Sequence, residues 1–458
     1  MTEPRLKLIN PAIEKMSRTE MLSLQERRLI AQVRRAYERI PYYRKRLPKE
    51  ASTLSSFAQF RDIIPFQSKA DLLVAQTDLM TEQVANPGSQ VVSMHMTSGT
   101  TGLGQEVHPL TKLDVEAMGS TWVYQAHWAG LNLGDSIVHT FPVGMQTGGL
   151  SSFSMAARMA SRFFQTGIYA TEKKIDYLLA YKPNALVISP AYLTRLQAVF
   201  EEKNISPKQA LPHLKAIFIA GENYTKDWAE RSIDFWGANI SEWYGLMQGG
   251  LNLCFSCEGG ILPNGKRGHL HIMEHRVLVE ILHPGTNDPV EPGEEGELVA
   301  TTLFREAFPI LRFRTGDRVR LMANTCSCGR HLMSIEAGTV ARYDDMMKIR
   351  GQNLWPDAVD KIVFFAGDIE EYKALVYVDK EGRETVDLAI EFKSNTGFSD
   401  SEKALRVKEI SSEINQKVNV RMDIREVPYL TLPRFEFKTR RWTDERRAGR
   451  DFIRYQSH

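Results

Sequence analysis

The chain has 458 residues, which is long enough for a large hydrophobic core and for more than one domain. Its 58 Lys and Arg residues nearly balance its 56 Asp and Glu residues, so its charge does not favour a nucleic acid or an anionic membrane as partner. The N-terminus lacks a secretory signal and no stretch approaches the roughly eighteen apolar residues of a membrane span, so we expect a cytoplasmic protein without membrane contact.

The first predicted element is a helix from Ser17 to Ile40. Ser17 and Glu20 have the spacing of a capping box, in which two residues satisfy each other's free N–H groups at a helix start. Apolar residues then recur at steps near three, four and seven, which places them on one face of the helix. We expect this face to pack against the rest of the protein.

A stretch rich in glycine and hydroxyl groups, MTSGTTG, follows the apolar run QVVSM. Glycine lets a backbone approach a phosphate closely, while N–H and O–H groups donate to its oxygens. The stretch differs from the common P-loop, because Gly102 is followed by Leu103 and Gly104 and no lysine is present. Taken alone, such a stretch is more often a surface turn than a phosphate site.

Three apolar runs between residues 135 and 222 alternate with amphipathic segments: DSIVHTF, ALVIS and LKAIFIAGE. This alternation predicts parallel strands joined by crossover helices, and such sheets bind ligands beyond the carboxyl ends of their strands. From about His269, the runs LHIM, VLVEIL and EGELVATTL predict a smaller antiparallel unit. Beyond Tyr343, ALVYVD, VDLAIEF and a helical stretch predict a compact α+β module.

Short motifs occur in the order TSGTTG, AGENYT, YGLMQGG, RFRTGDR, ARYDDMMKIRGQNLWP and LPRFEFKTRR. This succession resembles the adenylate-forming superfamily. The opening helix followed by AYERIPYYRKRL, and CSCGR before DDMMKIRG, are most similar to the phenylacetate-CoA ligase family. The resemblance covers essentially the whole chain. It implies the adenylate-forming α/β fold: a large N-terminal α/β domain with a smaller antiparallel β subdomain, residues 1–343, and a small mobile α+β C-terminal domain, residues 344–458.

The resemblance implies an ATP-dependent, AMP-forming carboxylate-CoA ligase. A carboxylate would attack the α-phosphate of ATP to give an acyl-adenylate and pyrophosphate, and the CoA thiol would then displace AMP. The acid is expected to be apolar, and aromatic or arylacetic like phenylacetate. Two alternatives stay open: an enzyme that adenylates its acid and loads a carrier protein or another nucleophile, and a nucleotide-binding relative with weakened catalysis. A homodimer is one option for its assembly.

The same resemblance assigns nucleotide contacts. Asp317 would accept both ribose hydroxyls, Tyr244 would lie beside the adenine, and Glu222 and Asn223 would line the base. From local sequence alone, Asp317 is more often a turn residue and Tyr244 is as often a core aromatic. Gln248 stands where the family commonly has a Mg²⁺-binding glutamate, and its uncharged amide oxygen would bind the cation more weakly. The expected ATP and AMP ligands are Thr97, Ser98, Gly99, Thr100, Thr101, Gly102, Glu222, Asn223, Tyr244, Gly245, Gln248, Asp317 and Arg342.

Lys438 matches the lysine that bridges the α-phosphate and the carboxylate during adenylation, a task that suits a point charge on a flexible stem. Its local sequence alone favours a surface lysine in a basic tail, and Phe437 replaces the glycine that commonly precedes it. The C-terminal domain is expected to rotate about Asp344 after adenylation. Arg350 and Gly351 would then enter the site for the thioester step, with Gly351 leaving room for the pantetheine arm.

The segment HTFPVGMQTGGL matches the acyl pocket, with Phe141, Val143 and Gly148 as lining residues. Its composition does not separate aryl, arylacetic and aliphatic acids. An apolar acid is nevertheless expected there.

A group of cysteine and histidine residues forms a candidate structural zinc site. Closed zinc sites use four thiolate or imidazole ligands, which Cys257, His271, Cys326 and Cys328 would supply. The pair Cys254 and Cys257 equally permits an all-cysteine set, and buried free thiols are the alternative to a metal. The expected cofactors are therefore ATP, Mg²⁺, CoA as the second substrate, and a structural Zn²⁺.

Overall fold

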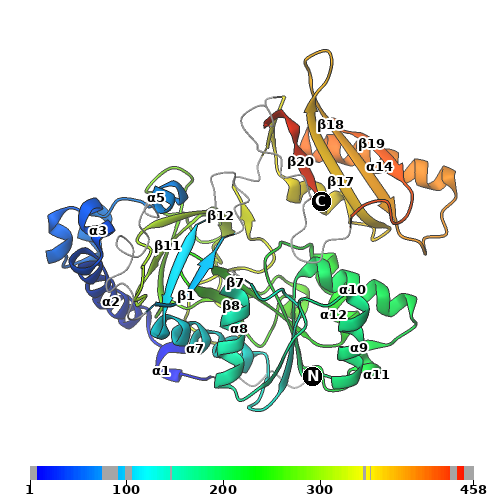
Figure 1. The fold of residues 1–458 in the computed structure, drawn as a ribbon. Helices are drawn as coiled ribbons and strands as arrows, with labels where there is room; N and C mark the ends of the chain where they lie inside the picture. The colour runs from blue at the N-terminus through cyan, green and yellow to red at the C-terminus, as the bar shows by residue number, and fades with distance from the viewer. Residues whose placement is uncertain are drawn as a thin grey trace. The chain divides into compact units, whose positions relative to one another are not determined.

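A computed structural model of the chain describes residues 8–74, 91–97, 106–144, 147–343, 347–350, 352–433 and 441–447. The chain divides into two compact units, residues 1–340 and 341–458 (Figure 1). The sequence prediction placed the boundary after residue 343. No helix among the described residues combines the length and the apolar character needed to cross a membrane.

The N-terminal unit opens with helices that cover one of its sheets. The predicted helix is confirmed as α2, Arg18–Arg39, with Ser17 and Ile40 as its caps and with both capping-box bonds to Glu20 present. The face of α2 that carries Leu29 and Val33 is buried in the core. The other helical elements here are α1 Pro11–Glu14, α3 Pro41–Arg46, η1 Lys49–Thr53, α4 Phe57–Ile63 and α5 Lys69–Val74.

An eight-stranded sheet forms the centre of this unit, in the order β13-β9-β8-β7-β6-β5-β3-β4. Strands β4, β3, β5, β6 and β7 are parallel to one another, as the alternation of strand and helix predicts. The remaining strands β8, β9 and β13 are antiparallel to their neighbours. The bounds are β3 Ser136–His139, β4 Arg162–Gln165, β5 Ala185–Ile188, β6 Ala216–Ile219, β7 Asn239–Leu246, β8 Leu251–Ser256, β9 His269–Ile272 and β13 Ser334–Glu336.

The LHIM run was predicted to join the smaller antiparallel unit, and that prediction is wrong. The tight turn Met247–Gly250 sends β8 back along β7, and LHIM, as β9, pairs antiparallel with β8. Its strand character was correctly predicted. The sheet to which β9 belongs depends on which strand the turn brings beside it.

Helices cover both faces of the central sheet (Figure 1). Alternate residues of β5 and β6 point to opposite faces, so Val187 and Phe218 pack in one core while Leu186 and Ile217 pack in another. Helices α7 and α8 cross closely, because a Cβ at Gly119 would collide with Ser154. The bounds are α7 Lys112–Trp128, α8 Thr147–Arg158, α9 Thr171–Tyr181, α10 Pro190–Glu202, α11 Pro207–Ala210 and α12 Lys226–Trp236.

A smaller antiparallel sheet is confirmed in this unit. Its strands β10 Val277–Leu282, β11 Glu295–Thr302 and β12 Phe313–Arg320 are consecutive antiparallel neighbours. A separate hairpin pairs β1 Val91–Met96 with β2 Val107–Thr111. The short helix η2, Pro263–Gly265, precedes β9.

The C-terminal unit is a compact α+β module, as predicted. Its sheet has the order β19-β18-β17-β20, in which β17 and β18 are antiparallel and both outer strands run parallel to their neighbours. Helices α13 and α14 bury Val359, Ile410 and Ile414 against this sheet. The bounds are β14 Ala341–Arg342, β15 Met347–Ile349, β16 Gln352–Leu354, α13 Pro356–Val363, β17 Ile369–Val378, β18 Glu384–Phe392, α14 Asp400–Val418, β19 Asp423–Val427, β20 Trp442–Asp444 and η3 Glu445–Arg447.

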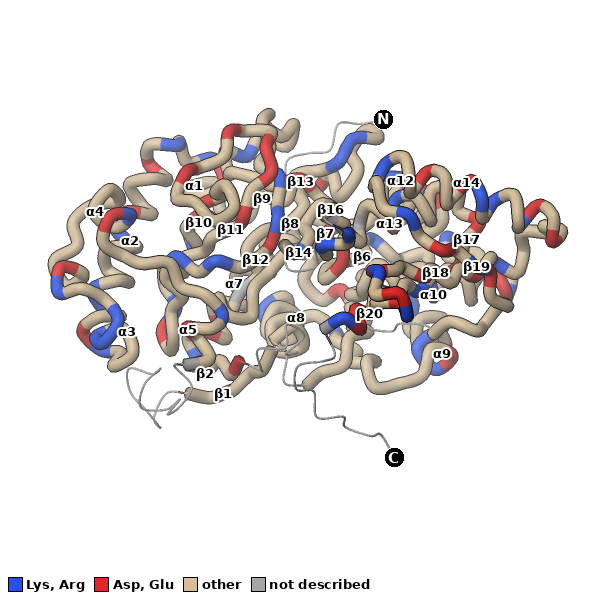
Figure 2. Tube along the Cα trace, turned by 90° about the horizontal axis from the view of Figure 1, so that it is seen from above, with Lys and Arg blue, Asp and Glu red and all other residues tan. Residues whose placement is uncertain are grey.

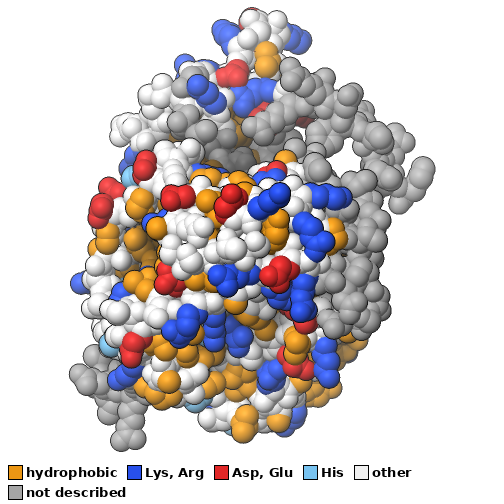
Figure 3. Space-filling view, turned by 90° about the vertical axis from the view of Figure 1, so that its left-hand side faces the viewer, with side chains coloured by type: hydrophobic (Ala, Val, Ile, Leu, Met, Phe, Trp, Pro, Cys, Tyr) orange, Lys and Arg blue, Asp and Glu red, His pale blue; other side chains and the backbone are white. Residues whose placement is uncertain are grey.

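Basic and acidic residues are interleaved along the trace, which agrees with the near balance of charge in the sequence (Figure 2). On the face seen in Figure 3, hydrophobic side chains lie between basic and acidic ones. Scattered exposed apolar side chains are normal on a solvated surface.

Candidate active site and metal cluster

Tyr244 and Asp317 are 73 positions apart in the chain and meet in the structure. The Tyr244 hydroxyl at the end of β7 donates a hydrogen bond to the Asp317 carboxylate on β12. Asp317 lies beside a break in the regular pairing of β12 with β11, at Gly316, whose φ of 72° favours glycine. The Asp317 backbone N–H donates to the Thr315 hydroxyl at 2.9 Å, which fixes this turn. The arrangement holds a buried carboxylate, an acceptor that suits paired hydroxyl groups.

Glu222 and Asn223 follow β6 at the carboxyl edge of the parallel sheet. The Glu222 carboxylate accepts a hydrogen bond of 3.0 Å from the backbone N–H of Ala191, at the start of α10. A carboxylate at a helix N-terminus also interacts favourably with the helix dipole. The two residues thus lie near the edge where a ligand is expected, and Glu222 has a structural bond there.

A buried hydrogen-bonded group of residues, which the sequence analysis missed, joins the segment after β6, strand β7 and the last residues of the N-terminal unit. The Tyr224 hydroxyl and the Gly338 backbone N–H, the latter at 2.8 Å, both donate to the Glu242 carboxylate. Arg267 stacks on the Tyr224 ring at 5.7 Å. Burial raises the pKa of Glu242 to about 7 and also raises the pKa of Tyr224. The only sequence signal was the position of Tyr224 within AGENYT.

The raised pKa of Glu242 predicts how stability depends on pH. The folded protein holds this proton more tightly than the unfolded chain, so the contribution to stability is complete below about pH 4.5 and is lost as pH rises through about 7. Glu242→Gln stays neutral throughout. At pH 8 the variant is expected to gain a free energy of unfolding on the order of 3 kcal/mol over the wild type.

Urea unfolding of both proteins between pH 5 and pH 8 measures this difference. The gain in free energy of unfolding of Glu242→Gln over the wild type should shrink toward pH 5, where Glu242 is protonated in the folded state. Glu230→Gln, at a position on α12 whose side chain is 47% exposed, is the matched control and should show no such trend. A difference between Glu242→Gln and the wild type that does not change with pH would contradict the assignment.

The predicted phosphate loop is closed at its base by Thr97 and Glu106. The Thr97 N–H donates to the Glu106 carbonyl, and the Glu106 N–H donates to the Thr97 hydroxyl, each at 2.9 Å. The Glu106 carboxylate is fully buried and accepts a hydrogen bond of 2.5 Å from the Gln248 amide. The sequence analysis missed Glu106. The predicted loop residues Ser98, Gly99, Thr100, Thr101 and Gly102 lie outside the described part of the chain.

Phe141 of the predicted acyl pocket belongs to a group of aromatic side chains. Its ring centroid is 6.3 Å from that of Trp243, which in turn is 5.0 Å from Trp122. Val143 and Gly148 are exposed and take no part in these ring contacts. His139 lies 5.5 Å from Phe141, and burial lowers its pKa to about 4, so this ring is neutral at physiological pH.

Several residues that the sequence analysis named for the two steps lie outside the described part of the chain, namely Asp344, Gly351, Phe437 and Lys438. Arg342 is on β14 and is partly buried. Arg350 has a left-handed backbone, with φ at 48°, and its guanidinium donates to the Glu384 carbonyl at 2.6 Å. Arg350 is therefore bonded within its own unit.

Buried carboxylates hold both flanks of the segment that carries Lys438. The Glu391 carboxylate on β18 accepts hydrogen bonds from the backbone N–H groups of Leu430 and Leu432, at 2.9 and 3.0 Å. The Arg441 guanidinium donates to Glu371 on β17 at 2.5 Å. The described residues on each side are thus tied to two neighbouring strands.

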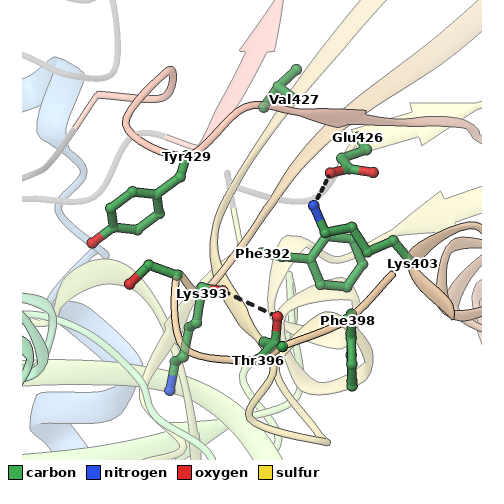
Figure 4. A pocket seen from close by; sticks show the side chains of 10 residues that line it. Phe392, Lys393, Thr396, Phe398, Lys403, Glu426, Val427 and Tyr429 are labelled. Carbon is green, nitrogen blue, oxygen red and sulfur yellow. Dashed lines mark hydrogen bonds and ion pairs between the residues drawn. The ribbon is translucent and has the colours of Figure 1, made fainter. Parts of the chain in front are cut away.

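A pocket of about 350 Å³ lies in the C-terminal unit, near the end of β18 and the start of α14 (Figure 4). The Lys403 ammonium forms an ion pair of 2.7 Å with Glu426 across its lining, and Phe392 and Phe398 supply apolar walls. None of the predicted site residues lines it. The lining also contains Lys393, so Glu426 offsets one of its two lysine charges.

Four predicted metal ligands converge in the N-terminal unit. The ligand atoms of Cys257, His271, Cys326 and Cys328 all lie within 4.8 Å of one another. Tetrahedral zinc with Zn–S bonds of about 2.3 Å requires sulfur atoms about 3.8 Å apart. The sulfurs of Cys257 and Cys326 are 3.7 Å apart, and His271 Nε2 is 3.3 Å from the sulfur of Cys328. The donor set and its spacing therefore fit a closed site.

The alternative ligand Cys254 is not part of this cluster. Cys254 and Cys257 are an odd number of residues apart at the end of a strand, and such side chains point to opposite faces. Burial lowers the pKa of His271, but its bonds to the thiols of Cys326 and Cys328 outweigh this effect and raise the pKa to about 9. A thiol group and an imidazole that interact this closely are typical of a metal site.

The cluster is braced by the N-terminal segment. The Arg330 guanidinium, two residues after Cys328, forms a buried ion pair of 2.8 Å with Glu14 on α1. Arg330 also stacks on the Trp128 ring at 4.1 Å, and Trp128 donates to Glu14 at 3.0 Å. This network joins the cysteine turn to α1 and α7.

Comparison with known proteins covers most of the chain. A family model for AMP-binding enzymes matches residues 19–302, and one for the AMP-binding enzyme C-terminal domain matches residues 351–446. The phenylacetate-coenzyme A ligase of Aromatoleum evansii is 30% identical over 421 residues, which cover 89% of this chain and 90% of that protein. The enzyme of the same name from Escherichia coli strain K12 is 27% identical, with coverage of 95% and 97%.

Solved structures show the same fold. A crystal structure of 2-hydroxyisobutyryl-CoA ligase in the postadenylation state, in complex with 2-HIB-AMP, matches with a TM-score of 0.85 at 22% identity. The match covers 96% of this chain and 92% of that one. The same ligase with 2-HIB-AMP and CoA in the thioesterification state matches with a TM-score of 0.68 at 22% identity, covering 95% and 91%.

Proposed function

The chain belongs to the AMP-binding enzyme family and, within it, to the phenylacetate-CoA ligase family, and on this premise we propose that its acid is aromatic or arylacetic, such as phenylacetate. It is an AMP-forming acid-CoA ligase. The observation that carries the acid class is the contact of Phe141, which follows β3 at the carboxyl edge of the parallel sheet, with Trp243 on β7. An aryl group bound there would pack against aromatic side chains.

Asp317 binds the ribose in the proposed site. A carboxylate accepts from both ribose hydroxyls, and the bond from Tyr244 leaves it oriented for them. Thr97 and the loop that follows supply hydroxyl and N–H donors to the phosphates. Mg²⁺ bound with ATP supplies positive charge to the same phosphates. These contacts hold the α-phosphate in place for attack by the acid.

Lys438 carries the charge that the first step needs. The acid and the α-phosphate are both anionic, and an ammonium group between them stabilises the transition state, in which the new P–O bond forms as pyrophosphate leaves. In the second step the CoA thiol attacks the acyl carbon and AMP leaves. Lys438 would obstruct that approach, so the C-terminal unit turns about Asp344 and brings Arg350 and Gly351 to the site.

The acid class is tested by specificity. Phenylacetate and hexanoate are compared through kcat/KM for acyl-CoA formation at saturating ATP and CoA. The aromatic ring is expected to favour phenylacetate by about fivefold, because a ring pair contributes about 1 kcal/mol beyond the area it buries. Equal or higher kcat/KM for hexanoate would reject the aromatic class and leave the ligase assignment intact.

Cys257, His271, Cys326 and Cys328 are proposed to hold a structural Zn²⁺. Elemental analysis of the purified protein should find about one zinc per chain, since the site has four ligands and no open position. Cys328→Ser is expected to lose the zinc and to lower Tm by several degrees or more. The matched control Cys254→Ala should keep it. Zinc retained in Cys328→Ser and lost in Cys254→Ala would contradict the ligand set.

Three further proposals concern partners and location. CoA, rather than a carrier protein, is the acceptor; acyl transfer to CoA without any carrier present tests this. Light scattering tests for a homodimer, which would have twice the chain mass of 52.1 kDa. Cell fractionation tests a cytoplasmic location.

A further inference from the structure

Glu106 lies at the base of the proposed phosphate loop with its carboxylate turned into the protein. Its backbone pairs with Thr97 across the loop base, which fixes the residue at the point where the two strands of the β1–β2 hairpin meet the loop. The carboxylate is fully buried. An acid at this place is unexpected, because a negative charge close to a triphosphate repels it.

The two oxygens of the Glu106 carboxylate have different surroundings. Oε2 accepts from the Gln248 amide at 2.5 Å and lies 3.1 Å from Nε2 of His108. Oε1 has no hydrogen bond to the described part of the chain. A buried carboxylate oxygen in this state is costly and calls for a cation.

Lys69 does not fully satisfy this oxygen. Its ammonium group lies 3.9 Å from Oε1, which is beyond hydrogen-bond distance. At 3.9 Å the ammonium offsets part of the charge without donating a hydrogen bond to the oxygen. Mg²⁺ prefers oxygen ligands at about 2.1 Å and is bound by one or two carboxylates together with phosphate oxygens.

Gln248 is held against this carboxylate by a buried arginine. Arg305 donates to the backbone carbonyls of Gln248 at 3.3 Å and of Pro109 on β2 at 2.9 Å. The turn after Gln248 approaches Arg305 so closely that a Cβ at Gly250 would collide with the guanidinium. Arg305 therefore fixes the Gln248 turn to the strand that follows Glu106. The contact between the side chains of Glu106 and Gln248 is therefore held in place by the surrounding fold.

We propose that Glu106 is the protein carboxylate that binds the Mg²⁺ accompanying ATP, through Oε1, and that Gln248 orients it. The negative charge expected at position 248 is thus supplied from position 106. The inference rests on the proposed ATP site in the N-terminal unit. It explains how an uncharged Gln248 is compatible with adenylation, because Glu106, which Gln248 contacts, supplies the negative charge.

Mn²⁺ binding tests this without relying on turnover. Electron paramagnetic resonance measures free Mn²⁺ during titration of the protein with saturating α,β-methylene-ATP, which cannot be cleaved at the α-phosphate. Glu106→Gln is expected to weaken Mn²⁺ binding in this complex about tenfold or more. The double variant Glu106→Gln with Gln248→Glu returns the charge to the other side of the contact and should recover most of that loss. Glu116→Gln, at a position on α7 whose side chain is 46% exposed, is the matched control and should leave Mn²⁺ binding unchanged.

Unchanged Mn²⁺ affinity in Glu106→Gln would overturn the proposal and leave Glu106 as a purely structural acid. If Glu106→Gln does not fold, Glu106→Asp keeps the charge but withdraws the carboxylate by one methylene. The same loss of Mn²⁺ affinity is then expected, and its absence overturns the proposal equally. A wild-type protein that does not bind the ATP analogue would instead sink the proposed ATP site itself.

Discussion

Replacing Lys438 with Ala is expected to slow acyl-adenylate formation by about a hundredfold to a thousandfold, the usual effect of losing one preorganised electrostatic contact to a transition state. ATP should still bind, because the ribose and phosphate contacts remain. Exchange of labelled pyrophosphate into ATP, dependent on the acid, measures the first step alone. Equilibrium binding of ATP is measured in parallel.

The second step separates the role of Lys438 from a general loss of structure. With chemically prepared acyl-adenylate and CoA, Lys438→Ala should form the thioester at close to the wild-type rate, since in the proposed mechanism the lysine leaves the site before this step. Lys417→Ala, an exposed lysine near the end of α14, is the matched control and should leave both steps intact. Full pyrophosphate exchange in Lys438→Ala would refute the assignment.

Replacing Asp317 with Ala is expected to weaken ATP binding by about a hundredfold. Two hydrogen bonds from ribose hydroxyls to a charged group are lost, each contributing about 1.5 kcal/mol or more, and the Tyr244 hydroxyl loses its partner. Calorimetric titration with α,β-methylene-ATP measures the change. The affinity of 2′,3′-dideoxy-ATP should differ little between variant and wild type, because that ligand lacks both hydroxyls.

Asp288→Ala removes an exposed acid from the turn between β10 and β11 and is the matched control for Asp317. It should bind ATP as the wild type does. Equal affinities of the Asp317 variant and the wild type for the ATP analogue would show that the ribose lies elsewhere. The Tyr244–Asp317 contact would then be a structural bond.

Much of the fold was predictable because local patterns decide it. The capping box at Ser17 and the buried runs of β3, β5 and β6 are set by neighbours in the sequence, and all of them formed as predicted. The sheet to which β9 belongs was not, because it depends on the turn Met247–Gly250 and on β8. Strand identity is local, whereas strand partners are a property of the whole chain.

The candidate site likewise contains some residues that the sequence identifies and others that only contacts in the folded chain identify. The zinc ligand set came from residue types and family position, and the odd spacing of Cys254 and Cys257 could have decided between the alternatives. Glu106 could not have been found in that way. Its role depends on contact with Gln248, 142 residues away, and a single sequence contains no record of that contact.

Mass spectrometry of the purified protein with ATP, Mg²⁺, CoA and a panel of aryl, arylacetic and fatty acids shows directly which product the enzyme forms and from which acid. We expect a new acyl-CoA from an aromatic or arylacetic acid, with AMP and pyrophosphate formed in equal amounts. Acyl-adenylate without thioester, ADP in place of AMP, or no acyl-CoA from any acid of the panel would contradict this expectation.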